Sequence, residues 1–286
     1  MIMRNDFAVF ILTNGRPNKV VTYNSLKKSN YTGNVFIVVD DKDDTLLQYK
    51  KKFGDMVIVF SKDNMAKTFD EGDNFNDRRS IVYARNACFD IAKKLGVTYF
   101  IQLDDDYTSF IYKFDEKLAY RERPIKNLDA VFSALLRFYI GIDALTITMA
   151  QNGDFIGGKN STWAKDVKLH RKAMNTFICS IKRPFQFIGR INEDVNTYVN
   201  MGSKGSLMMT VPNIAIIQRS TQKTKGGMTE LYLDGGTYLK SLYSVMINPS
   251  CVKIAKMGQS HKRLHHKVAW NNAVPKIISE DYRASA

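Results

Sequence analysis

Residues 99–106 of this chain read Tyr-Phe-Ile-Gln-Leu-Asp-Asp-Asp. The apolar, aromatic and β-branched residues 99–103 predict a buried strand. Asp104 and Asp106 are two positions apart, so on an extended backbone their carboxylates point to the same side. Such hard oxygen ligands suit Mg²⁺ or Mn²⁺, ions that commonly bridge phosphate oxygens. An acidic, solvated turn explains the triplet equally well, since aspartate is favoured in turns.

The rest of the sequence sets bounds on this choice. A chain of 286 residues can bury a full core, as one large domain or as one domain with an appendage. No stretch resembles a transmembrane span or a signal peptide, so we expect no membrane association. The cysteines, Cys88, Cys179 and Cys251, are widely spaced and odd in number, which favours reduced thiols over a disulfide framework.

Charge is the outlying property of the composition. The chain has 42 lysines and arginines against 28 aspartates and glutamates, a formal net charge of +14. This balance favours polyanions such as nucleic acid, nucleotides or anionic membranes, although many basic proteins bind no nucleic acid. Acids gather at residues 40–44 and 104–106, whereas residues 159–190 and 253–276 are strongly basic. An acidic pocket beside basic surface suits a metal site that faces a polyanionic partner.

Strand and helix signals alternate ahead of the aspartates. We expect strands over residues 7–12, 35–39, 56–60 and 99–103, and helices over residues 19–27, 45–52 and 79–95. Asn18 is placed to cap the first helix, and a loop is expected over residues 61–77. Units of this kind predict a parallel sheet with helices on its faces, and ligands beyond the carboxyl ends of its strands.

The alternation breaks after Asp106. A helix is expected over residues 127–139 and a strand over residues 144–148, followed by short strands, glycine pairs and basic loops. No internal repeat, low-complexity tract or clear linker divides the chain. We therefore expect a single α/β domain over residues 1–286, in which the second half extends the first sheet.

Several motifs occur in the order found in GT-A glycosyltransferases, which the chain resembles over nearly its whole length. They are the strand end at residues 13–17, Tyr-Ala-Arg-Asn at 83–86, the aspartate triplet, and Asn-Glu-Asp at 192–194. The back half, through residues 226–228, 236–241 and 264–267, resembles the TET-associated glycosyltransferases of tailed phages. These are thought to glycosylate hydroxymethylated pyrimidines in DNA. The resemblance implies a Rossmann-like, mixed but mostly parallel sheet with an acceptor-side extension.

The same resemblance implies which part of the chain performs which function. Residues 1–106 would bind the nucleotide sugar, expected to be a UDP-sugar, and residues 107–286 would bind the acceptor and catalyse transfer. Asp104 and Asp106 would hold Mn²⁺ or Mg²⁺ on the donor diphosphate. Many GT-A enzymes complete the metal site with a late histidine, which makes His261 or His265 the expected third ligand. A cytoplasmic location is expected, in the host cell if a phage encodes the protein.

Residues implied to bind the donor are Thr13, Asn14, Arg16, Asp40, Asp63, Arg85, Asp104 and Asp105. Arg85 is expected to reach the diphosphate with paired donors, which lysine cannot match; a salt bridge to a nearby acid is the alternative. Asp105 points away from Asp104 and Asp106. It would either form a hydrogen bond to the sugar or ribose, or stabilise the turn. Asp40 and Asp63 would recognise ribose or base, or serve as helix caps or loop acids.

Glu193 and Asp194 precede an expected helix over residues 195–200, with Asn192 as its cap. The helix dipole favours acidic residues in the first turn of a helix, and this effect alone explains the presence of both acids. In GT-A enzymes that invert the anomeric carbon, an acid at this place takes the acceptor's proton. The resemblance therefore implies Asp194 as the base, Glu193 as its support, and an inverting reaction.

The expected acceptor is hydroxymethylated, double-stranded DNA. Trp163, Lys223, Lys225 and Tyr232 mix aromatic and cationic side chains, as surfaces that contact phosphates and stack on bases do. The leading interpretation is sugar transfer to 5-hydroxymethylcytosine or a related base. The enzyme would reach that base in the major groove or flip it into a pocket, and the sequence leaves both routes open. A nucleotidyltransferase and a non-catalytic DNA-binding protein are the alternatives.

Overall fold

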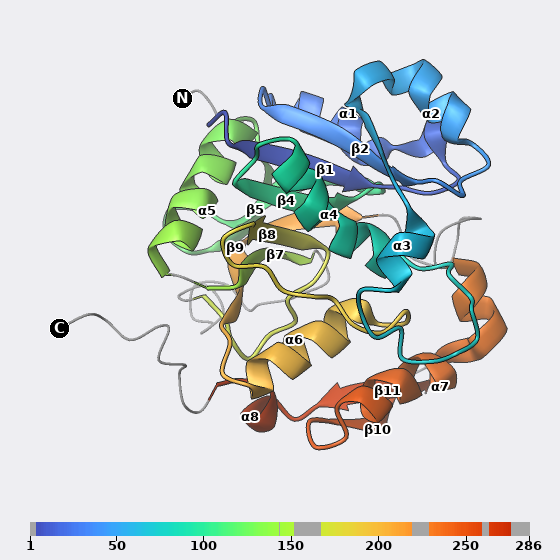
Figure 1. Cartoon of the computed structure of the whole chain (residues 1–286). Coiled ribbons are helices and arrows are strands. Elements are labelled where there is room, and N and C mark those ends of the chain that lie inside the picture. The colour runs from blue at the N-terminus through green and yellow to red at the C-terminus, as the bar shows by residue number, and fades with distance from the viewer. Residues whose placement is uncertain (1–3, 143, 152–166, 219–228, 259–262, 276–286) are drawn as a thin grey trace.

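Parallel strands carry the amino-terminal half of the fold (Figure 1). The computed structural model describes residues 4–142, 144–151, 167–218, 229–258 and 263–275. The strands lie in the order β3-β2-β1-β4, all parallel, with bounds β1 Phe7–Leu12, β2 Asn34–Asp40, β3 Val57–Phe60 and β4 Tyr99–Asp104. Every side chain of β1 is buried, because both faces of this strand are covered.

Helices connect these strands much as the periodicity predicts. They are α1 Val21–Lys28, α2 Leu46–Phe53, α3 Lys62–Ala66 and α4 Val82–Lys94, with 3₁₀ turns at Pro17–Lys19 and Gly54–Met56. Asn18 lies inside the first 3₁₀ turn and does not cap α1, whose N-cap is Val20. The segment expected to be only loop, residues 61–77, contains the short α3.

The second half of the chain extends the sheet with mostly antiparallel neighbours. The nine-stranded order is β3-β2-β1-β4-β8-β7-β9-β5-β6, and β4 meets β8 antiparallel. The added strands are β5 Tyr107–Phe114, β6 Tyr120–Pro124, β7 Thr146–Gln151, β8 Thr176–Ser180 and β9 Met208–Gln218. Only β7 and β9 pair in parallel among them. The prediction of an α/β fold around one mixed sheet is confirmed.

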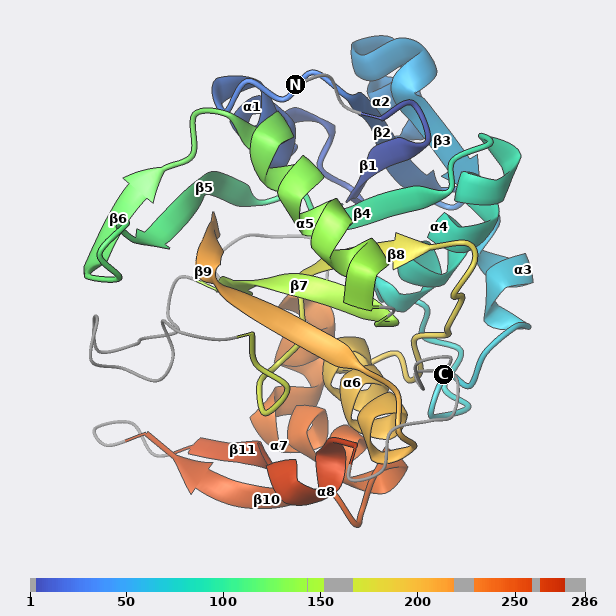
Figure 2. The ribbon, with the colours of Figure 1, turned by 90° about the vertical axis from the view of Figure 1, so that its left-hand side faces the viewer.

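Two hydrophobic cores lie on opposite faces of this sheet (Figure 2). Helices α1, α2 and α5 (Leu128–Ile142) cover one face, where Phe7, Val9 and Ile11 point. Helices α3, α4 and α6 (Glu193–Ser203) cover the other, where Ala8 and Phe10 point. The covering of both faces fixes the strand register, because a slip by one residue would exchange the two sets of side chains.

The carboxyl-terminal elements pack beside α6 (Figure 1). They are α7 Thr229–Ile247, the antiparallel hairpin of β10 Val252–Met257 and β11 Arg263–Val268, and the short α8 Trp270–Ala273. All three cysteines are buried free thiols, as predicted. Within the described ranges, no helix has the length and apolar character needed to cross a bilayer.

Candidate active site

Strands β1 and β4 end side by side, which brings the segments after them together. Leu12 pairs with Asp104, and the next residues meet through a 2.6 Å hydrogen bond from Thr13 Oγ1 to Asp105 Oδ2. Arg16 Nε lies 3.4 Å from the same carboxylate oxygen. Burial raises the pKa of Asp105 to about 6, although Arg16 and Thr13 act in the opposite direction. Asp105 therefore binds the two strand ends together.

Asn14 and Asp40 are also close together, at the ends of β1 and β2. Asn14 Nδ2 donates to Asp40 Oδ2 over 2.8 Å, and Lys62 Nζ lies 3.0 Å from that oxygen. Asp63, one residue after Lys62, is exposed and pairs with Lys42 and Arg78 at 3.2 and 2.7 Å. Asp40 thus belongs to the buried edge of the strands, while Asp63 belongs to the surface.

Asp104 is the last residue of β4, and its side chain is 24% exposed. Burial raises its pKa to about 6, and the negative charges of Asp106 and Asp194 add to this effect, which Arg85 only partly offsets. Three carboxylates therefore share one region of the carboxyl edge. Clustered carboxylates repel one another unless a positive charge lies among them. Carboxylate oxygens are also the ligands that Mg²⁺ and Mn²⁺ prefer.

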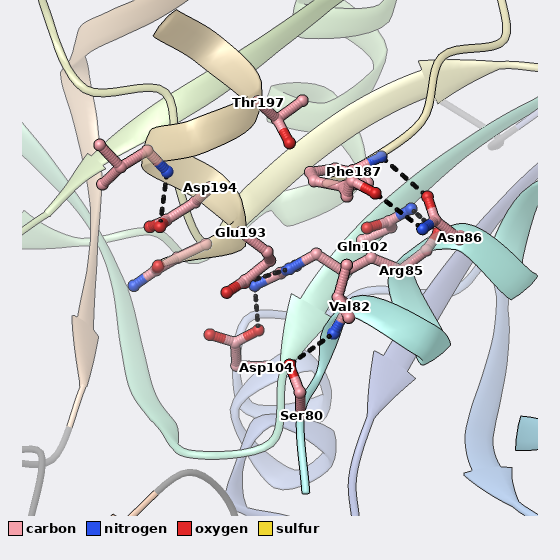
Figure 3. Close-up of polar contacts among 12 residues, drawn as sticks. Ser80, Val82, Arg85, Asn86, Gln102, Asp104, Phe187, Glu193, Asp194 and Thr197 are labelled. Carbon is pink, nitrogen blue, oxygen red and sulfur yellow. Dashed lines mark hydrogen bonds and ion pairs between the residues drawn. The ribbon is translucent and has the colours of Figure 1, made fainter. Parts of the chain in front are cut away.

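Arg85 links this region to the start of α6 (Figure 3). Its Nη2 donates to Asp104 Oδ1 and its Nε to Glu193 Oε1, each over 3.0 Å. The guanidinium also lies 5.0 Å from the ring centroid of Phe177. Arg85 is fully buried at 1% exposure, so it does not point outward to a diphosphate as expected. The alternative holds: its salt bridges fix two acidic side chains.

Asn192 turns the chain into α6 without capping that helix. Its backbone is left-handed (φ 55°, ψ 41°), a conformation that asparagine tolerates better than most residues. Its Nδ2 donates instead to the carbonyl oxygen of Lys240 over 2.7 Å and lies 3.2 Å from Ser244 Oγ, both on α7. The prediction of Asn192 as a side-chain cap was therefore wrong, because the side chain joins α6 to α7.

Glu193 and Asp194 occupy the first turn of α6 and are buried. Glu193 faces Arg85, whereas Asp194 Oδ1 accepts a 2.7 Å hydrogen bond from the backbone N–H of Val195 (Figure 3). Burial, and the charge of Asp194 beside it, raise the pKa of Glu193 above its ordinary value. The two neighbours are thus held in different surroundings, and only Glu193 contacts Arg85 through a 3.0 Å bond.

The charge of Asp194 acts on two partly buried lysines, Lys172 and Lys240. Burial lowers the pKa of both Lys172 and Lys240, while the charge of Asp194 opposes that shift. The charge of Arg263, on β11, adds to the lowering in both. Sequence reasoning did not single out Lys172 or Lys240, because they come from segments far apart in the chain and no local pattern predicts their meeting.

His265, one of the two histidines expected to complete the metal site, does not join the aspartates in the described part of the chain. Among the residues that the structure describes, no three His, Cys, Asp or Glu side chains form a group able to hold a metal ion. His265 lies among Lys172, Arg263 and Lys240, and its pKa is lowered by burial and by these cations. His261 and Trp163 lie outside the described residues.

Two aspartates are nevertheless a sufficient protein contribution to such an ion. Mg²⁺ is commonly bound through one or two carboxylates plus substrate phosphates and water. Asp104 and Asp106 fit that arrangement, since Asp104 ends β4, Asp106 lies two residues later, and the negative charge of Asp106 acts on Asp104 to raise its pKa. The chemistry of these two side chains therefore fits a divalent ion, whereas His261 lies outside the described residues.

The α/β sheet thus carries aspartates at the carboxyl end of β4, and the acidic pair Glu193 and Asp194 lies at the start of α6. The sequence model of the TET-Associated Glycosyltransferase family matches residues 7–227. The chain belongs to this family and is a glycosyltransferase, which confirms the resemblance seen in the sequence. Membership also removes the nucleotidyltransferase and the non-catalytic DNA-binding protein as interpretations.

Solved structures of glucosyl-3-phosphoglycerate synthase from Mycobacterium tuberculosis are similar to this chain at low identity. The complex with Mg²⁺ and UDP is 9% identical, with 92% of this chain and 87% of that chain covered and a TM-score of 0.45. The complex with Mn²⁺ and UDP-glucose is 9% identical, with 92% and 86% covered and a TM-score of 0.47. No curated protein matches the sequence.

Proposed function

We propose that this glycosyltransferase moves a sugar from a nucleotide-diphosphate sugar, a UDP-sugar in our expectation, onto 5-hydroxymethylcytosine or a related base in DNA. Membership of the TET-associated family supports the transfer. The net charge of +14 supports a DNA acceptor. The observation that carries the proposal is the ion-pair network in which Arg85 joins Asp104, at the end of β4, to Glu193, the neighbour of Asp194 at the start of α6.

The donor half comprises residues 1–106 in this proposal. Thr13, Asn14, Arg16 and Asp40 would contact the nucleoside, because they meet at the ends of β1 and β2. Asp104 and Asp106 would hold Mn²⁺ or Mg²⁺. When bound, the ion supplies neutralisation of the charge that grows on the leaving diphosphate.

Residues 107–286 would bind the acceptor and move its proton. In a single displacement, the acceptor hydroxyl oxygen bonds to the anomeric carbon while the bond from that carbon to the diphosphate oxygen breaks. The hydroxyl proton passes to Asp194, and the electron pair leaves with the nucleoside diphosphate. The hydrogen bond from Val195 N–H orients Asp194 for this role, and Arg85 keeps Glu193 directed away from it. Attack opposite the leaving group inverts the anomeric carbon.

Mass spectrometry of nucleosides tests this proposal directly. The protein is incubated with hydroxymethylated DNA, Mn²⁺ and a panel of nucleotide sugars, and the DNA is digested. We expect the hydroxymethylated nucleoside to gain the mass of one sugar, and unmodified DNA or excess chelator to give no product. Absence of any mass gain across the panel would reject the DNA acceptor.

A further inference from the structure

Asn175 lies beside the aspartate triplet, on the side of β4 that faces away from β1. It directly precedes β8, whose first residue, Thr176, pairs with Leu103. Because β4 and β8 are antiparallel, the next position of this ladder sets Asn175 across from Asp104. The Asn175 backbone is left-handed, with φ 69°, and its carbonyl oxygen accepts a 2.5 Å hydrogen bond from the Tyr107 hydroxyl. Contacts with residues before and after the triplet therefore fix its position.

Gln218 reaches the same place from β9. It is the last residue of that strand and pairs with Tyr107, which directly follows Asp106. Asn175 Nδ2 donates a 2.8 Å hydrogen bond to Gln218 Oε1. The bond joins the ends of two strands that are not neighbours in the sheet, since β7 lies between β8 and β9. Asn175 and Gln218 thus form an amide pair that borders the triplet.

The amide pair retains groups that can bind a ligand. Each amide has a carbonyl oxygen that accepts and an amino group that donates two hydrogen bonds, and the bond within the pair uses one group of each residue. In the part of the chain that the structure describes, no partner is assigned to Asn175 Oδ1 or Gln218 Nε2. Neither atom belongs to the buried polar atoms that lack a hydrogen bond, so a ligand can reach both. The pair therefore offers one acceptor and one donor group at a fixed place.

Sugar hydroxyl groups are the partners that suit this pair. A hydroxyl both donates and accepts, so neighbouring hydroxyls can bond to a carbonyl oxygen and an amino group together. Neutral amides also suit a neutral sugar, whereas phosphates attract cations. In the proposed function, Asp104 and Asp106 hold the ion on the donor diphosphate, and the sugar is bonded directly to that diphosphate. Residues that border the triplet are therefore within reach of the sugar ring.

The acceptor base also carries hydrogen-bond donors and acceptors. In the proposed single displacement, the acceptor approaches the anomeric carbon from the side opposite the diphosphate, where Asp194 would take its proton. The amide pair instead borders Asp104 and Asp106, which are on the diphosphate side of that carbon in the proposed function. The position of the pair therefore favours the donor sugar over the acceptor base.

We propose that Asn175 and Gln218 bind hydroxyl groups of the donor sugar and determine which sugar the enzyme accepts. This inference rests on the proposed function for its nucleotide-sugar donor and is independent of the acceptor. It adds two residues from the second half of the chain to the recognition of the donor.

Binding without DNA gives the first test. Calorimetric titration in Mn²⁺ measures the dissociation constants of UDP, UDP-glucose, UDP-galactose and UDP-N-acetylglucosamine. In Asn175→Gly and Gln218→Met, binding of the preferred UDP-sugar should weaken about five- to tenfold relative to UDP, the loss expected for about one hydrogen bond. Glycine suits the left-handed backbone, and methionine keeps the length of glutamine without its polar atoms. An unchanged ratio in both variants overturns the inference, as does a wild type that binds UDP but no UDP-sugar.

Two amides elsewhere in the chain provide matched controls. Asn30 is also left-handed, with φ 54°, and its Nδ2 bonds the Lys126 carbonyl over 3.0 Å at the surface. Gln186 is exposed, and its Nε2 bonds the Thr68 carbonyl over 2.7 Å. Asn30→Gly and Gln186→Met should leave the ratio of UDP-sugar to UDP binding unchanged. A change in these controls as large as in the amide pair overturns the inference, and melting temperatures verify that all four variants are folded.

Sugar preference in turnover gives the second test. With hydroxymethylated DNA as acceptor, kcat/KM is measured for each UDP-sugar in the wild type and in Asn175→Gly and Gln218→Met. The preference among UDP-sugars should narrow by about fivefold or more, with the acceptor KM unchanged, because the contacts that distinguish hydroxyls are lost. A raised acceptor KM with the same sugar preference would assign the pair to the acceptor base and overturn the inference. Absence of product in the wild type rejects the DNA acceptor alone, since calorimetry tests the amide pair without DNA.

Discussion

Arg85 and Glu193 form a buried ion pair, Nε to Oε1 at 3.0 Å, across 108 positions of sequence. The same guanidinium holds Asp104, the last residue of β4, at 3.0 Å. One side chain on α4 therefore sets the distance between the carboxylate proposed to hold the metal ion and the helix that carries the proposed base. These ion pairs also offset the free-energy cost of burying the charged side chains.

Arg85→Ala should destabilise the fold by about 3 to 5 kcal/mol, because it leaves buried carboxylates without their partner. Arg85→Lys keeps the charge but lacks the planar fork that reaches both acids, so it should fold and still lose turnover. Denaturant unfolding and kcat measured on the same samples separate the two effects. Wild-type turnover in Arg85→Lys would show that the bridge does not position the site.

Asp194→Asn should reduce sugar transfer by about 100-fold to 10,000-fold, the range expected when a general base is lost. Asparagine preserves the shape of the side chain and can still accept the bond from Val195 N–H. Calorimetric titration with nucleotide diphosphate and Mn²⁺ should therefore give nearly wild-type affinity. Retained turnover in this variant would exclude Asp194 as the base, and Glu193→Gln would then be the next variant to measure.

The metal-free protein should lose stability as the pH rises from about 4 to about 7, the interval set by the ordinary and the folded-state pKa values of Asp104 and Asp105. Asp104 and Asp105 both have pKa values raised to about 6 from an ordinary 3.8, so the fold favours their neutral forms. That contribution is present at low pH and is lost as each group ionises through its folded-state pKa. Each carboxyl is expected to contribute on the order of 1 to 3 kcal/mol.

Thermal unfolding with and without Mn²⁺ checks this pH dependence. The ion should raise the melting temperature more at pH 7.5 than at pH 5, because it binds the ionised carboxylates. Asp104→Asn should flatten the pH dependence of the metal-free protein and weaken the response to Mn²⁺. A melting temperature that is independent of Mn²⁺ at pH 7.5 would contradict the metal site.

Asn192→Ala should destabilise the protein by about 1 to 3 kcal/mol, since alanine is strained in the left-handed conformation and cannot bond α7. Asn192→Gly relieves the strain and loses only the side-chain bonds, so it should lie between wild type and alanine. The midpoints of denaturant unfolding rank the stabilities of the wild type and the two variants. Equal midpoints for alanine and glycine would show that the bonds to Lys240 and Ser244 outweigh backbone strain.

Local patterns predicted the first four strands well, whereas β5 and β6, which follow the aspartate triplet, were not predicted. The strand over residues 7–12 has the predicted bounds, and β4 ends at Asp104, one residue past the prediction. Helix starts were less predictable: Asn18 and Asn192 both have capping side chains, yet neither caps. Tertiary bonds to α7 outweighed the local preference in the case of Asn192.

The sequence indicated which types of residue would lie at the candidate site. It did not indicate which of these residues would contact one another. The charges of Asp106 and Asp194 both act on Asp104, and the roles of the three residues stay predictions. A salt bridge of Arg85 was one of the two alternatives, but the sequence did not indicate that Glu193 would be its partner, or that Lys172 and Lys240 would lie near His265. Both outcomes depend on how α4, α6 and the β10–β11 hairpin pack, and a single sequence does not determine that packing by inspection.

The change from parallel to antiparallel pairing at β4 and β8 has an evolutionary consequence. Every residue proposed to contact the nucleotide or to hold its metal ion precedes β8 in the chain, whereas Gln218 and Asp194, the proposed base, follow β8. A lineage can therefore exchange the later segments for others and address a different sugar or modified base while keeping its nucleotide site. The ion pair of Arg85 with Glu193 sets the compatibility rule for such chimeras: an incoming segment must carry a carboxylate that reaches Arg85.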